Sequence, residues 1–148
     1  MNFLFDAASV FILLVKCLKM TKANCETILV IEDDQPIRDA IQHALELEGY
    51  NVLAAADGQE GLEILRTAAR PCLILLDLMM PIMNGWEFLE ELRKDKLSMI
   101  ATLPVIITSA AGRAADSAVQ QAQGYIKKPI NLDLLLDMVA KFCGVPVA

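Results

Sequence analysis

Two short apolar runs in this chain end in carboxylates, and that repetition constrains the fold more than any other feature. The run at 28–31 is followed by the acidic residues 32–34, and the run at 72–76 is followed by Asp77. Runs of this length and apolarity are typical of strands buried on both faces of a parallel sheet. Ligands bind at the carboxyl edge of such a sheet. The sequence therefore predicts a carboxylate cluster that holds a divalent cation, with or without one carboxylate acting as a nucleophile.

The chain from Thr27 onward alternates apolar runs of strand length with segments of helical period. Strands are predicted at 28–31, 51–55, 73–76, 104–108 and 125–127. Helices are predicted from 35–36 to a cap at Gly49, from 57–58 to just before Pro71, after the cap residue Asn84, at 114–121 and at 132–142. Residues 94–102 are predicted to form a surface loop. This alternation predicts an α/β fold in which helices cover both faces of a parallel sheet.

Four side chains follow the ends of four predicted strands, and the common edge turns them into one predicted site. They are Asp33, Asp77, Ser109 and Lys128. Each alone has a plainer interpretation, because strand-end aspartates often form turns and lysines are usually solvated. Ser109 rather than Thr108 is assigned to the predicted site, because the strand counted from residue 104 includes Thr108 and Ser109 is the next residue.

Composition excludes several classes of function. The 148 residues suit one domain with a real core, and the net charge of −6 without a basic patch argues against direct nucleic-acid binding. A single histidine, His43, and the lack of a cysteine cluster argue against zinc. The cysteines show no CxxC pairing and are interpreted as reduced thiols of a cytoplasmic protein. They are Cys17, Cys25, Cys72 and Cys143.

The N-terminal residues 1–25 form an apolar extension to the domain predicted at 26–144, which is followed by a tail at 145–148. The uninterrupted apolar stretch at 7–15 is far shorter than the ~20 residues that span a bilayer, so a membrane span is not predicted. Three interpretations stay open. In the first, Met20 is the true start of the protein. In the second, the segment is a helix that packs on the domain or on a second copy. In the third, the segment is a membrane-surface anchor.

Four pieces of sequence, in order, resemble the receiver domain of two-component response regulators. They are ILVIEDD at 28–34, DLMMP at 77–81 with Gly85, PVIITSA at 104–110, and KP at 128–129. The resemblance covers about residues 26–144. It implies a flavodoxin-like, doubly wound, five-stranded parallel sheet with strand order 2-1-3-4-5.

The resemblance also implies a phosphorylation site that depends on Mg²⁺ or Mn²⁺. Asp77 is then the phosphoacceptor. The phosphoryl group comes from a histidine kinase or from a histidine phosphotransfer protein. Asp33, Asp77 and the backbone carbonyl of Met79 are implied as direct metal ligands, and Glu32 as a ligand through water.

Three further residues take the family's places around the phosphoryl group. Lys128, before a proline that is often cis in the family, is implied to contact a phosphoryl oxygen. Ser109 is implied to hold another oxygen and to move inward on phosphorylation. Tyr125 is implied to fill the space that Ser109 leaves, so these two residues form the switch.

The chain departs from the family pattern before Lys128. The segment between Ser109 and Lys128 is shorter than usual, and Gln-Ala-Gln-Gly at 121–124 replaces the usual Gly-Ala. Because this region forms the output surface in the family, the downstream protein target is unknown and a homodimer stays open. We also expect a stand-alone, cytoplasmic receiver that is not a classical enzyme.

Two alternatives differ in class. A phosphorylation-independent, receiver-like scaffold would bind partners without the chemistry, and the shortened segment is its support. A phosphohydrolase with an aspartate nucleophile usually has a second aspartate two residues later, where this chain has Met79.

Overall fold

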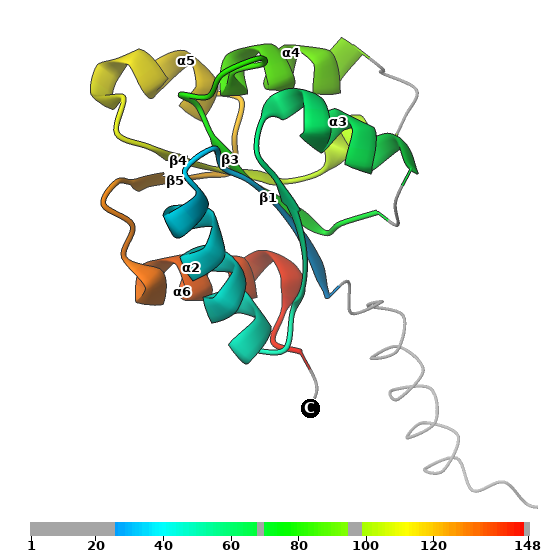
Figure 1. The fold of residues 1–148 in the computed structure, drawn as a ribbon, viewed down its shortest axis with the longest axis vertical. Coiled ribbons are helices and arrows are strands. Elements are labelled where there is room, and N and C mark those ends of the chain that lie inside the picture. The colour runs from blue at the N-terminus through cyan, green and yellow to red at the C-terminus, as the bar shows by residue number, and fades with distance from the viewer. Residues whose placement is uncertain (1–25, 68–69, 95–98, 147–148) are drawn as a thin grey trace, which may run out of the picture.

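Five parallel strands form one sheet between two layers of helices (Figure 1). The computed structural model describes residues 26–67, 70–94 and 99–146. The strand order is β2-β1-β3-β4-β5, which confirms the predicted fold class. The strands are β1 (Thr27–Ile31), β2 (Asn51–Ala55), β3 (Leu73–Asp77), β4 (Val105–Ser109) and β5 (Gly124–Lys127).

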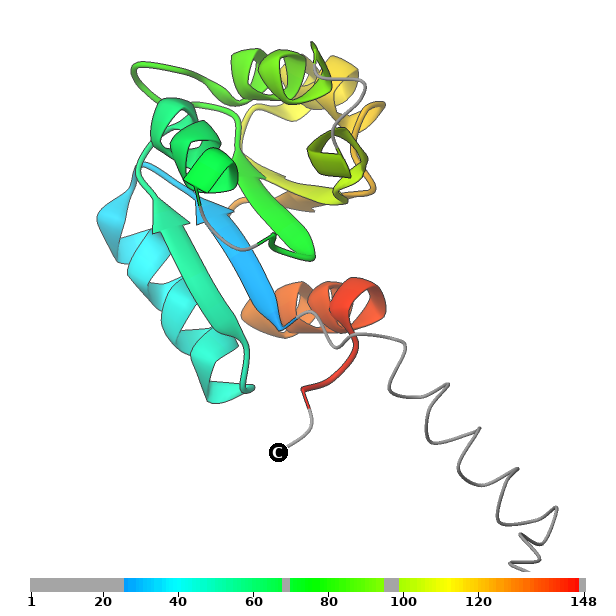
Figure 2. The same ribbon diagram turned by 90° about the vertical axis from the view of Figure 1, so that its right-hand side faces the viewer.

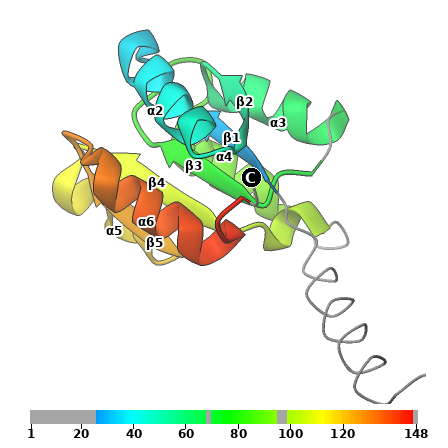
Figure 3. The same ribbon diagram turned by 90° about the horizontal axis from the view of Figure 1, so that it is seen from below.

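The helices divide between the two faces of the sheet (Figures 1 and 3). One face is covered by α2 and α6, and the other by α3, α4 and α5. Two 3₁₀ turns, Met99–Thr102 and Gly112–Ala115, lie on either side of β4. The helices are α2 (Gln35–Leu47), α3 (Gly58–Thr67), α4 (Gly85–Lys94), α5 (Asp116–Val119) and α6 (Leu132–Cys143).

The alternation of side chains along the central strands builds two cores. In β3, Leu73 and Leu75 pack in the core under α2 and α6, whereas Ile74 and Leu76 pack in the core under α3 and α4. All five residues of β3 and all five of β4 are buried. Burial on both faces explains why these strands read as continuous apolar runs.

Local capping fixes where the site-forming loops end. Asp34 Oδ1 accepts a hydrogen bond from the Ile37 N–H at 3.2 Å, which starts α2 directly after β1. Asn84 and Glu87 each accept the other's backbone N–H, at 2.9 and 3.0 Å, and so cap α4 as a capping box. Gly49 follows α2 with φ of +93°, a conformation that glycine adopts without strain.

The fourth strand lies one residue later than predicted. It begins at Val105 because Pro104 has no N–H to give to a ladder. It includes Ser109, whose carbonyl accepts the Lys128 N–H at 3.0 Å. Ser109 and Asp77 are therefore the last residues of their strands rather than the first residues after them.

The helix predicted at 114–121 was too long. Only Asp116–Val119 is α-helical, after the 3₁₀ turn at Gly112–Ala115. No side chain caps α5, because its N-cap residue is Ala115. The shortened segment before β5 thus holds a single turn of α-helix.

Some expectations fall outside the described residues. They include the interpretations of residues 1–25, with Met20 as the start, and the part of the predicted surface loop at 95–98. Within the described ranges, no helix is long and apolar enough to cross a membrane.

Candidate functional site

Three carboxylates gather at the carboxyl edge of the sheet. Glu32 and Asp33 follow β1, and Asp77 ends β3, which is the neighbouring strand. One oxygen from each lies within 4.8 Å of the others. Glu32 and Asp77 are only 1% and 3% exposed, whereas Asp33 faces solvent. The topology therefore produces the predicted cluster.

Lys128 supplies the cationic group of the cluster. Its Nζ lies 2.7 Å from Glu32 Oε2 and 3.4 Å from Asp77 Oδ1. Burial lowers the pKa of Lys128, but the hydrogen bond to Glu32 and the charge of Asp77 outweigh burial and raise it overall. The Lys128–Pro129 peptide bond is cis, as the resemblance implies.

The pKa of Asp77 is raised from 3.8 to about 7. Burial is the largest cause, followed by the negative charge of Glu32, and a hydrogen bond with Asp33 also raises it. Lys128 and the Met79 N–H act in the opposite direction but do not cancel these effects. One ammonium group is therefore too little positive charge for three carboxylates, and the site favours a second cation.

The donor set fits Mg²⁺. Oxygen ligands of Mg²⁺ lie at about 2.0–2.1 Å from the ion, so two opposite ligands are ~4.2 Å apart. Carboxylate oxygens spread over as much as 4.8 Å suit two direct ligands and one that binds through water. The Met79 N–H donates to Asp77 Oδ1 at 3.4 Å, which keeps this residue beside the cluster. Its carbonyl as a ligand stays a prediction.

The two predicted switch residues, Ser109 and Tyr125, are in contact. The Tyr125 hydroxyl donates to the Ser109 carbonyl at 3.1 Å. The Ser109 side chain is buried, and its Oγ accepts the Ala111 N–H at 3.0 Å. In the register of the sheet, Thr108 lies opposite Asp77, so Ser109 is one position beyond the phosphoacceptor candidate. Their roles as a switch stay predictions.

Two further residues support the site: Arg38, which the sequence did not single out, and Gly85, which is part of the family resemblance. Arg38 in α2 donates to the Glu32 carbonyl at 2.7 Å and so holds the loop after β1. Nothing in the local pattern distinguishes Arg38 from any other basic residue on an exposed helix. A Cβ on Gly85 would lie 2.5 Å from the Asp77 carbonyl oxygen, so glycine permits α4 to approach the end of β3.

Comparison with known protein families identifies the family of this chain. The model of the response regulator receiver domain matches residues 28–140. The chain belongs to this family. The receiver is similar to the DNA-binding dual master transcriptional regulator RpaA of a Synechocystis species, with 36% identity over 115 residues. It is also 36% identical over 110 residues to the phosphate regulon regulator PhoB of Pseudomonas aeruginosa.

The receiver spans about half the length of the curated relatives that it matches. The match to RpaA covers 76% of this chain and 46% of that protein, and the match to PhoB covers 72% and 46%. The names of these relatives describe transcriptional regulators, so the expectation that no nucleic acid is bound gains no support from them.

Solved receiver structures match this chain over most of their length. The receiver domain of the Francisella response regulator 1452 is 30% identical, with a TM-score of 0.72, and 80% of this chain covers 96% of that one. TrrA of Thermotoga maritima, solved in complex with Mg(2+)-BeF, is 30% identical with a TM-score of 0.69. The aligned region includes 79% of this chain and 98% of TrrA.

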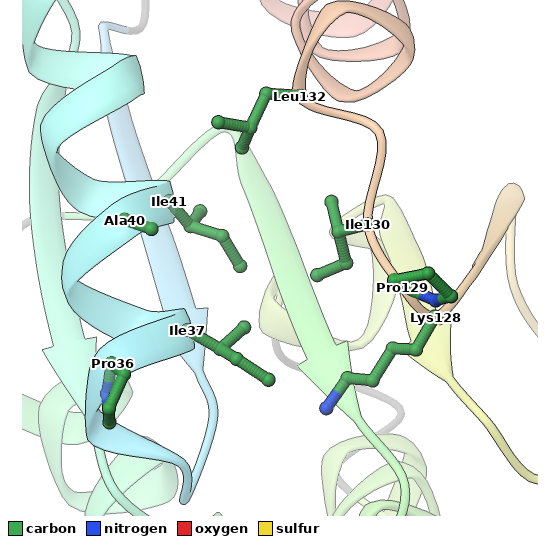
Figure 4. Close-up of a pocket in the computed structure, with 8 residues that line it drawn as sticks. All are labelled: Pro36, Ile37, Ala40, Ile41, Lys128, Pro129, Ile130 and Leu132. Atoms are coloured by element: carbon green, nitrogen blue, oxygen red, sulfur yellow. The ribbon is translucent and has the colours of Figure 1, made fainter.

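An apolar groove of about 300 Å³ opens beside Lys128 (Figure 4). One wall comes from the first turns of α2, and the other from the loop between β5 and α6. Lys128 lies at one end of the groove, with its ammonium group directed toward the carboxylate cluster. The other lining residues are Pro36, Ile37, Ala40, Ile41, Pro129, Ile130 and Leu132.

Proposed function

We propose that this receiver accepts a phosphoryl group on Asp77 from a phosphohistidine donor in a two-component phosphorelay. The observation that carries the proposal is the nearly buried Asp77 carboxylate, which lies within 4.8 Å of Glu32 and Asp33 oxygens and 3.4 Å from the Lys128 ammonium. An Asp77 oxygen attacks phosphorus while the P–N bond of the donor breaks. The imidazole nitrogen keeps the electron pair and takes a proton from solvent.

Positioning and electrostatics provide most of the catalysis in such a transfer. Asp33, Asp77 and the Met79 carbonyl would hold Mg²⁺ directly, and Glu32 would hold it through water. The bound ion supplies positive charge to the phosphoryl oxygens. Lys128 moves its ammonium from the two carboxylates to a phosphoryl oxygen, since it already lies 3.4 Å from the attacking carboxylate.

Phosphorylation would then be read by Ser109 and Tyr125. A phosphoryl oxygen replaces the Ala111 N–H as the hydrogen-bonding partner of the Ser109 hydroxyl, and the hydroxyl becomes the donor. Tyr125 follows because its own hydroxyl is bonded to the Ser109 carbonyl. The last two strands and α5 carry the change to the surface.

The donor is proposed to dock in the groove of Figure 4. An apolar groove that ends at Lys128 suits a helix of the donor protein, which would then lie beside the reacting atoms. A histidine kinase and a histidine phosphotransfer protein share this chemistry. The downstream protein target, the stand-alone form, the cytoplasmic location, the absence of direct nucleic-acid binding and a homodimer remain predictions.

A second candidate is the phosphorylation-independent scaffold. The single turn of α-helix in α5 favours it, because this segment differs most from the family pattern. The intact cluster at Glu32, Asp77 and Lys128 favours the phosphoacceptor instead. A phosphohydrolase is less favoured, since the position of its second aspartate is held by the exposed Met79.

Intact mass after incubation with phosphoramidate, a small donor with a P–N bond, tests the proposal. With Mg²⁺ present, we expect a gain of one phosphoryl group, about 80 Da. The gain should be lost with EDTA and in Asp77→Asn, and kept in Asp137→Asn, which changes an exposed aspartate of α6. An unmodified wild-type chain after rapid quenching would instead support the scaffold.

A further inference from the structure

Two thiols meet at the edge of the sheet opposite the phosphoacceptor. Cys72 lies immediately before β3, and Cys143 is the last residue of α6. Their Sγ atoms are 2.9 Å apart, although the residues are 71 positions apart in the chain. Both residues are partly exposed. Nothing in the phosphoryl chemistry uses either of them.

We propose that Cys72 and Cys143 are a redox modification site, at which a small-molecule disulfide such as oxidised glutathione forms an intramolecular disulfide. An S–S bond is about 2.05 Å long, so the two sulfur atoms need to approach by only ~0.9 Å. Disulfides of proteins in reducing compartments are usually transient and redox-sensing. The expectation of reduced thiols therefore describes one of the two states of this pair.

Hydrogen bonds outside the pair hold both cysteines in place. The Cys72 N–H donates to the Thr27 carbonyl at 2.9 Å, and its thiol lies 3.2 Å from the same oxygen. On the other side, the Tyr50 hydroxyl donates to the Gly144 carbonyl at 2.5 Å. Tyr50 is buried, and burial is the main cause of its raised pKa, so its hydroxyl keeps its proton at neutral pH. These hydrogen bonds therefore hold the segments of Cys72 and Cys143 next to each other.

The reaction is two successive thiol–disulfide exchanges. The thiolate of one cysteine attacks a glutathione sulfur, which forms a mixed disulfide and releases one glutathione thiolate. The thiolate of the other cysteine attacks the protein sulfur of that mixed disulfide and releases the second glutathione. Two electrons pass to the oxidised glutathione, and the two protons of the cysteine thiols go to the glutathione thiolates. Both residues are partly exposed, which gives the oxidant access to this edge of the sheet.

The bond would join the far ends of the two segments that build the phosphoryl site. β3 begins after Cys72 and ends in Asp77, while α6 follows the Lys128–Pro129 loop and ends in Cys143. Figure 2 shows the red C-terminal end of α6 near the start of β1, whereas the phosphoryl site lies where the strands end. Oxidation would therefore link α6 covalently to the sheet and restrict movement of α6 away from the sheet. The bond would lie apart from the residues that carry out the phosphoryl transfer.

The test uses the full chain and oxidised glutathione, followed by alkylation and intact mass. In the Cys17→Ser, Cys25→Ser double variant, we expect a loss of about 2 Da and no alkylation, because both remaining sulfur atoms are consumed. A dithiothreitol-reversible rise of roughly 5–15 °C in the unfolding midpoint should accompany the bond. With Cys143→Ser added, a stable glutathione adduct on Cys72 should replace the bond.

Peptide mapping of the oxidised wild-type chain keeps the test decisive if a serine variant folds poorly. A cross-link between the peptides of Cys72 and Cys143 supports the proposal. Two alkylated thiols, two separate glutathione adducts, or a cross-link that uses Cys17 or Cys25 would overturn it. None of these readouts depends on phosphorylation of Asp77, so the two proposals can fail separately.

Discussion

At the scale of single residues, the site is defined by an imbalance of charge. Glu32 and Asp77 are both buried, and they share the single ammonium group of Lys128. Burial, and then the negative charge of Glu32, raise the pKa of Asp77 to about 7, and the ammonium of Lys128 does not offset them. A poorly compensated carboxylate stabilises a cation or a phosphoryl-bound metal better than one already neutralised by its neighbours.

Asp77→Asn should stabilise the metal-free protein above neutral pH. The pKa of Asp77 is higher in the folded state, so its favourable contribution is complete below about pH 4 and is lost as the pH rises through about 7. In EDTA at about pH 8, we expect the free energy of unfolding to rise by about 1–3 kcal/mol in the variant. Urea unfolding measures this.

The same comparison at about pH 5 is the control, since the gain should shrink as wild-type Asp77 becomes protonated. Asp137→Asn should change the free energy of unfolding little at either pH. A variant that is less stable than wild type at about pH 8 would show that Asp77 is fully compensated without metal.

Lys128→Ala should slow phosphorylation from a small donor by about 10- to 100-fold, because a positioned cation near the transferred oxygens is removed. The matched control is Lys127→Ala, which changes the exposed neighbour in β5 and should leave the rate within about twofold of wild type. Stopped time points analysed by intact mass give both rates. Equal rates in the two variants would remove Lys128 from the chemistry.

At the scale of elements, the positions of strands and helices depend on how closely they pack as well as on their apolar pattern. The strands were predicted well because continuous apolar runs are required where both faces are buried, as in β3. The boundary of β4 was wrong by one residue, since Ser109 continues the ladder through its carbonyl. The length of α5 was also wrong, because its composition permits a helix but no side chain caps it.

Gly85→Ala should destabilise the receiver by about 2–3 kcal/mol, because the new methyl group would meet backbone atoms at 2.5 and 2.7 Å that cannot easily move. Gly124→Ala is the matched control. Its Cβ would also meet an atom at 2.5 Å, but that atom is the flexible end of Met138. We expect a cost below about 1 kcal/mol there. Chemical denaturation compares the two, and equal costs would contradict the assigned role of Gly85.

At the scale of the whole molecule, strand order creates the site. β1 lies next to β3, which brings Glu32 to Asp77 across 45 positions of sequence (77 − 32). Sequence reasoning could place these residues at one edge, because ends of parallel strands share an edge. It could not predict the Arg38 contact or the thiol pair, since both depend on how α2 and α6 dock rather than on any local pattern.

Mg²⁺ should stabilise the folded receiver, because only the folded chain assembles the three carboxylates. At a concentration about 100-fold above the dissociation constant, the expected gain is about 2.7 kcal/mol. Thermal unfolding with Mg²⁺ and with EDTA measures it as a shift of several degrees. Asp33→Asn should remove most of the shift, whereas Asp137→Asn should keep it. The same shift in both variants would place the ion elsewhere.

The most direct measurement locates the phosphoryl group. After incubation with acetyl phosphate and Mg²⁺, borohydride reduction converts a phosphorylated aspartate to homoserine, which peptide mass spectrometry assigns to a position. If Asp77 is the phosphoacceptor, homoserine appears at position 77 and nowhere else, and the EDTA control shows none. Homoserine at Asp33 or at any other aspartate, with position 77 unmodified, would contradict the proposed function.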